Sequence, residues 1–91
     1  MVQLLAVQLS EPGTDENHIK MVRWYNPQDG SINVATVAVM VDWIQNRRGV
    51  AYTYDGNIRS DVVVSNLVPP GIRAKPPNGV RQTLLDLPRF V

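Results

Sequence analysis

Residues 34–49 read VATVAVMVDWIQNRRG, and the structure that this stretch adopts decides the fold class. Its valines suit a strand as well as a helix. The spacing favours a helix, because on a helical wheel one stripe holds only apolar residues: Val34, Val37, Met40, Val41 and Ile44. Small and polar residues fall opposite, and only Val39 is out of place. The sequence therefore predicts a helix over residues 34–46, with a strand as the alternative.

The residues at both ends of this segment also favour a helix. Ser31 or Asn33 is suited to cap the N-terminus, because its side-chain oxygen accepts a backbone N–H of the first turn. Arg47 and Arg48 fall in the last turn, where cations interact favourably with the helix dipole. Gly49 follows as a residue that adopts the left-handed conformation typical of a helix end.

Strand-like segments flank this helix on both sides. Apolar and β-branched runs predict strands over five segments, which are 2–9, 18–25, 50–54, 57–65 and 72–75. The dipeptide Asp55-Gly56 is a hairpin signal between two of them. Ninety-one residues are too few for two cores, so a single α+β domain over residues 1–91 is expected. We expect a four- to five-stranded, mainly antiparallel sheet with one helix packed across a face, in the order β-β-α-β-β-β.

The chain closes with TLLDLPRFV, residues 83–91, which is unusually apolar for a chain end. It contains Leu84, Leu85, Leu87 and Phe90, with Pro88 restricting the backbone. Burying such side chains contributes about 1.5–3 kcal/mol each before entropy, which is enough to order a terminus. We therefore predict an apolar strap that folds back over the sheet or the helix, and an exposed docking peptide is the alternative.

The composition excludes several classes of protein. Hydrophobic residues make up 44% of the chain and charged residues 19%, as in globular proteins, and no run approaches the ~20 apolar residues of a membrane span. The absence of cysteine excludes disulfides, thiolate zinc sites and thiol catalysis. The opening residues lack the basic region and cleavage site of a signal peptide. A cytoplasmic protein without a membrane partner is expected.

Residues suited to catalysis or metal binding are few. His18 is the only histidine, and it lies close to Asp15 and Glu16, which are able to orient a general base or to join it in holding a metal. No nucleophilic serine lies in a strained elbow such as G-x-S-x-G, and no glycine-rich phosphate loop precedes a helix. The sequence therefore predicts a protein that is not an enzyme, with no catalytic residue, metal site or cofactor.

Two binding hypotheses remain. The first is protein–protein interaction or self-association, because aromatic residues are concentrated at interfaces. Its candidate residues are Trp24, Tyr25, Trp43, Tyr52 and Tyr54. The second is nucleic-acid binding by the basic C-terminal half, where residues 46–91 hold seven cations against three acidic residues. Its candidate residues are Arg47, Arg48, Arg59, Arg73, Lys75 and Arg81. The net charge of only +1 favours the first hypothesis, with an unknown protein or a second copy as the partner.

Three motifs carry a resemblance to a known family. HIKMVRW at residues 18–24, VDWI at 41–44 and the closing TLLDLPRF at 83–90 are similar to a family of small bacterial proteins classed only as a domain of unknown function. The sequence departs from that family's pattern at Gln8, Val80, Gln82 and Thr83. The resemblance implies a compact fold, and it implies no activity and no binding residues.

Overall fold

The structure is a computed structural model that describes residues 1–11, 13, 15–65 and 70–90. It contains one helix, six strands and two short 3-10 turns. In chain order these elements are β1 (Val2–Leu9), η1 (Glu16–His18), β2 (Ile19–Asn26), β3 (Ser31–Thr36), α1 (Val37–Asn46), β4 (Ala51–Asp55), β5 (Ile58–Val64), β6 (Ile72–Lys75) and η2 (Leu84–Asp86). The α+β class with a single helix is confirmed.

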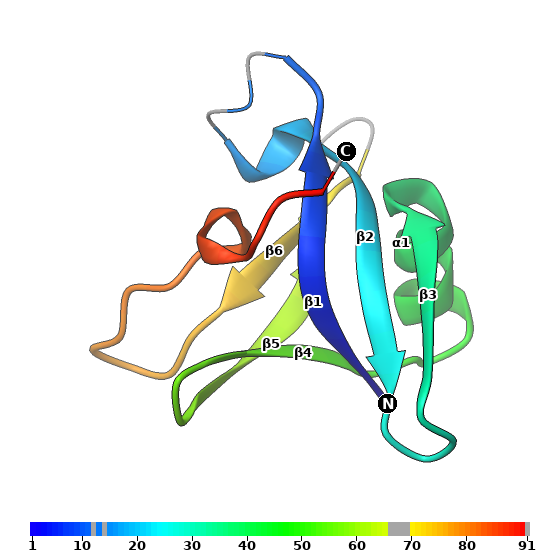
Figure 1. Ribbon diagram of the computed structural model, residues 1–91. Coiled ribbons are helices and arrows are strands. Elements are labelled where there is room, and N and C mark those ends of the chain that lie inside the picture. Colours follow the sequence, from blue (N-terminus) through cyan, green and yellow to red (C-terminus); the bar gives the residue numbers. More distant parts are fainter. Residues whose placement is uncertain (12, 14, 66–69, 91) are drawn as a thin grey trace.

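All six strands belong to one sheet, in the order β3-β2-β1-β4-β5-β6 (Figure 1). Neighbouring strands are antiparallel except β1 and β4, which pair in parallel at Val2 with Ala51 and at Gln3 with Tyr52. The sheet is therefore mixed, with one strand more than the upper limit of our prediction. The order along the chain is β-β-β-α-β-β-β, because a further strand precedes the helix.

The predicted helix over residues 34–46 begins too early. Residues 31–36 form β3, which pairs with β2 without a bulge, and the helix begins at Val37. Thr36 caps it: its Oγ1 accepts the backbone N–H of Val39 at 3.2 Å, so neither Ser31 nor Asn33 is the cap. The strand forms because the turn through Gly30, at φ +74°, returns the chain along β2. Pairing with β2 then outweighs a helical pattern that Val34 fits equally well.

Two β-bulges bend the sheet. Leu5 is an extra residue in β1, because Leu4 pairs with Trp24 and Ala6 already pairs with Arg23. A second register shift leaves Lys20 as the extra residue in β2. Bulges strengthen the local twist, so β1 and β2 curve away from the plane of β4–β6. They also explain why both faces of β1 are apolar, since the core-facing phase changes within the strand.

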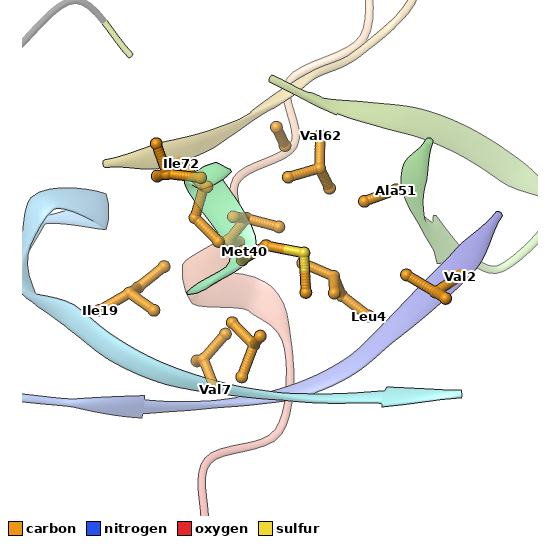
Figure 2. Close-up of a cluster of buried hydrophobic side chains, with 12 residues drawn as sticks. Val2, Leu4, Val7, Ile19, Met40, Ala51, Val62 and Ile72 are labelled. Atoms are coloured by element: carbon orange, nitrogen blue, oxygen red, sulfur yellow. The ribbon is translucent and has the colours of Figure 1, made fainter. Parts of the chain in front are cut away.

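The core lies inside this curved sheet. Figure 2 shows Met40 of α1 between Leu4 and Val7 of β1 on one side and Val62 and Ile72 of β5 and β6 on the other. The helix contacts β2 and β3 near one edge of the sheet and β5 and β6 near the other. It therefore closes the opening that the curvature leaves, and the predicted apolar stripe of the helix faces the core from residue 37 onward.

The C-terminal segment folds back over the sheet as a strap, as predicted. Leu84 is fully buried in the core, and Leu87 packs against the core. Beyond them the chain pairs with β1: the Val7 N–H donates to the Pro88 carbonyl at 2.9 Å and the Phe90 N–H donates to the Val7 carbonyl at 3.0 Å. The half-buried Phe90 ring lies under the Arg23 guanidinium, 4.6 Å from its centroid. The strap thus extends the sheet along the part of β1 that β4 leaves unpaired.

Candidate functional site

A groove of about 660 Å³ lies between α1 and the β2–β3 hairpin. Its floor and walls come from Val2 of β1, Trp24 and Asn26 of β2, and Ala35 of β3. The helix supplies the opposite wall with Ala38, Val39, Met40, Asp42 and Trp43, and Arg47 follows at the helix end. A hollow of this size with a mainly apolar lining is the typical form of a binding site in a small domain.

The helix wall of this groove explains the one residue that broke the helical pattern. Val39 is 59% exposed, on the side of α1 that faces away from the core residues Met40 and Val41. One turn later Trp43 lies on the same side, because residues four positions apart are neighbours on a helix. The sequence signal of the groove was therefore an apolar residue, Val39, on the otherwise small and polar face of the helix.

Gly49 fixes the position of the Trp43 ring. A Cβ at Gly49 would overlap the indole, so only glycine allows the chain to pass this close to the ring. The N–H groups of Arg47 and Gly49 both donate to the Trp43 carbonyl, at 3.2 and 2.9 Å. The left-handed residue at the helix end is Arg48, with φ 53°, and not Gly49 as predicted. Glycine is needed here for the close approach and not for its φ angle.

The polar rim of the groove is solvent-exposed. Asp42 accepts from the Nδ2 of Asn46 at 2.7 Å and lies 3.6 Å from Nε of Arg47. Both charged side chains are more than half exposed, so this ion pair contributes little to stability. The rim therefore holds charges of both signs beside an apolar floor.

The structure brings together only two of the five aromatic residues predicted for an interface. Trp24 and Trp43 line the groove from opposite walls. Tyr52 and Tyr54 pack edge to face on β4, with centroids 5.6 Å apart, and the Arg59 guanidinium covers the Tyr52 ring. Tyr25 pairs with Ile32 of β3 on the sheet face opposite the core. The predicted set therefore divides into a groove pair, a β4 pair and one tyrosine near the edge strand.

The basic residues predicted for nucleic acid also divide between elements. Arg59, Arg73 and Lys75 lie on the outer face of β5 and β6, where Arg59 and Lys75 border a second hollow of about 530 Å³. Asp61 lies in the same hollow, 3.9 Å from Nε of Arg59. The other three lie outside this face: Arg47 and Arg48 follow α1, and the exposed Arg81 precedes the strap. An acidic residue inside the basic patch weakens its attraction for phosphates.

The acidic residues around His18 have structural roles. Asp15 and His18 form a capping box: Asp15 accepts from the Asn17 N–H, and Nδ1 of His18 accepts from the Asp15 N–H at 3.2 Å. Glu16 points elsewhere, since its Oε2 accepts the N–H groups of Ala74 at 3.0 Å and Leu84 at 2.9 Å. No cluster of three or more potential metal ligands occurs among the described residues.

A buried polar pair went unrecognised in the sequence. Ser60 and Gln82 are both almost fully buried, and the serine hydroxyl donates to Oε1 of Gln82. This bond joins β5 to the segment before the strap. Since buried polar groups need partners, the pair helps to fix the path of the C-terminal segment.

Comparison with known proteins gave no relatives: no family model, no curated protein and no solved structure matches the chain. The resemblance to small bacterial proteins of unknown function therefore stays a prediction. In the described part of the chain, neither the helix nor the short turns have the length and apolar character needed to cross a bilayer.

Proposed function

We propose that this protein is a non-catalytic interaction module, and that its groove receives an apolar side chain from a protein partner. The observation that carries this proposal is the position of the two tryptophans. They are the only tryptophans in the chain, and both line this groove. Tryptophan is enriched among the residues that dominate the energy of protein interfaces.

The form of the groove favours a protein partner that inserts an aliphatic or aromatic residue. Its walls are apolar, and its rim carries the exposed Asp42–Arg47 ion pair. This arrangement, with an apolar centre inside a charged rim, is that of a protein–protein interface. The charges of both signs on the rim suit a partner with polar residues around one buried anchor.

The two tryptophans also provide the test. Because every tryptophan of the chain lines the groove, a bound partner will change the intrinsic fluorescence directly. Val39→Asp places a charge in the groove at an exposed helix position, so the fold is expected to survive. Ile58→Asp is the matched control, since Ile58 is also exposed and lies outside the groove.

We expect a purified partner, first obtained by affinity capture, to shift the tryptophan emission of the wild type and of Ile58→Asp. Val39→Asp should bind that partner at least about tenfold more weakly, because burying an unpaired carboxylate is costly. Equal binding by all three proteins, or binding without any change in tryptophan emission, would show that the groove is not the site.

A further inference from the structure

The strand β3 has an open edge. It ends the sheet on one side, and within the described ranges no strand pairs with its outer edge (Figure 1). An edge strand presents backbone N–H and C=O groups that are ready to pair with another chain. Natural proteins therefore protect such edges with charges, prolines, bulges or a covering segment.

The opposite edge, β6, carries these protections. Arg73 and Lys75 are exposed charges on the strand, and Pro76 and Pro77 follow it directly. Glu16 of η1 covers part of the edge by accepting the N–H of Ala74. β3 has none of these features: its sequence SINVAT contains no charge and no proline, and its register with β2 is unbroken. The same chain thus protects one edge and leaves the other suited to pairing.

Exposed apolar side chains accompany the open edge. Ile32 and Val34 are 58% and 41% exposed, although they are among the more hydrophobic residues of the chain. They point to the outer face of the sheet, beside Tyr25 and Arg23 of β2. Ala35, by contrast, faces inward, toward the groove and the core. The side chains of a partner strand on β3 would therefore pack beside Ile32 and Val34 on the outer face of the sheet.

We infer that the occupant of this edge is a second copy of the chain, paired antiparallel through β3 with Asn33 on the two-fold axis. In an antiparallel pair, residues directly opposite each other lie on the same face. A two-fold register that keeps both outer faces together must therefore set even-numbered residues of β3 opposite even-numbered ones. When Asn33 lies on the axis, Ile32 of each copy stands opposite Val34 of the other, which gives two identical apolar pairs.

Charge and pattern both favour self-pairing in this register. On the outer face, neighbouring side chains across the joined sheet then follow in the order Tyr25, Ile32, Val34 and Arg23. The last two belong to the second copy. No like charges stand opposite each other, and aromatic, β-branched and aliphatic neighbours of this kind stabilise cross-strand pairs. Centring on Val34 would instead set Ile32 opposite Thr36 and lose apolar contact. Because five paired residues make a small interface, we expect a weak dimer that forms only at high protein concentration.

Sedimentation velocity over a range of concentrations tests the pairing. The wild type should shift from monomer to dimer, and Ile32→Lys should raise the dissociation constant at least about tenfold, because it places a charge in the apolar row. Ile58→Lys is the matched control, since it changes an exposed strand isoleucine away from β3 and should leave the dimer intact. A wild type that stays monomeric, or pairs only with a different protein, would overturn the inference.

The register has its own test, because the chain contains no cysteine. A single cysteine at Asn33→Cys should form a disulfide-linked dimer under mild oxidation, since residues opposite each other across strands have Cβ atoms close enough to bridge. Asn57→Cys, at the exposed tip of the β4–β5 hairpin, should link far more slowly. Equal linking of the two variants, or faster linking of Val34→Cys, would contradict the proposed axis. These results are independent of the groove, so the proposed function stands or falls separately.

Discussion

The structure gives Glu16 a structural role that its sequence neighbours do not indicate. In the sequence it lies between Asp15 and His18, and the three suggest a general base or a weak metal site. In the structure its carboxylate joins three segments, because Oε2 accepts N–H groups from β6 and from the start of η2. The two donors lie 58 and 68 residues further along the chain. No local pattern reveals partners at that distance.

Replacing Glu16 is expected to destabilise the fold. Glu16→Ala leaves two part-buried N–H groups without their acceptor, and the expected loss in the free energy of unfolding is about 2–4 kcal/mol. Urea denaturation measures it, with Glu11→Ala as the control, because Glu11 is an exposed acidic residue nearby. Equal stability of the two variants would mean that the Glu16 carboxylate does not hold these segments.

Gly49 follows the helix as predicted, but for a different physical reason. A glycine after the last helical turn signals the helix end. The helix ends at Asn46 with Arg47 as its C-cap, so neither Arg47 nor Arg48 lies in the last turn as predicted. The reason differs, because Arg48 adopts the left-handed conformation and Gly49 makes room for the Trp43 ring. Contact between a ring and the chain six residues later depends on how the helix end is packed, which spacing alone does not specify.

Among the secondary-structure elements, the start of α1 differs most from its prediction, because the helix begins at Val37 and not at residue 34. Val34 continues the apolar stripe of the helix. It also lies two residues after Ile32, so the two apolar residues alternate as in a strand. β2 decides between them, because its outer edge pairs with residues 31–36. Thr36 then separates strand from helix as the cap. Periodicity predicted the helix and its core face, whereas its first residue depended on strand pairing with β2 across the preceding turn.

The strap is an element whose burial was predicted from composition, and neighbouring leucines allow a sharp test. Leu84→Ala should lower the free energy of unfolding by about 2–5 kcal/mol, since Leu84 is fully buried in the core. Leu85→Ala should cost about 1 kcal/mol, because Leu85 is only half-buried. Thermal or urea denaturation gives both values. Similar losses from the two changes would mean that the strap does not enter the core through Leu84.

Across the whole molecule, the charge asymmetry of the sequence is divided between surfaces. The C-terminal half is basic, but its cations lie on separate elements, and Asp61 lies among those of β5 and β6. Of the two cations at the helix end, Arg47 is paired, since its Nε lies 3.6 Å from the Asp42 carboxylate. A strong electrostatic attraction for nucleic acid needs many cations on one surface. This arrangement favours the protein-interaction hypothesis.

Nucleic-acid binding is therefore expected to be weak or absent near physiological salt. The measurement is the retention of labelled DNA and RNA, single- and double-stranded, over a series of salt concentrations. Any binding at low salt should fall steeply as salt rises, and the double change Arg47→Gln and Arg48→Gln should alter it little. Micromolar binding at physiological salt, abolished by that double change, would reverse the order of the two hypotheses.

Local patterns in the sequence specify the α+β class, the single helix with its core-facing stripe, the β4–β5 hairpin and the strap that folds back at the C-terminus. Each of these depends on local spacing, turn chemistry or the cost of exposing apolar residues, which are all present in the linear chain. Pairing with β2 across a short turn made Ser31–Thr36 a strand. The packing of the folded chain set two further features: the sheet is mixed, and Trp24 and Trp43 share one groove. These features depend on which distant segments meet, and that is set by the packing of the whole chain around one core.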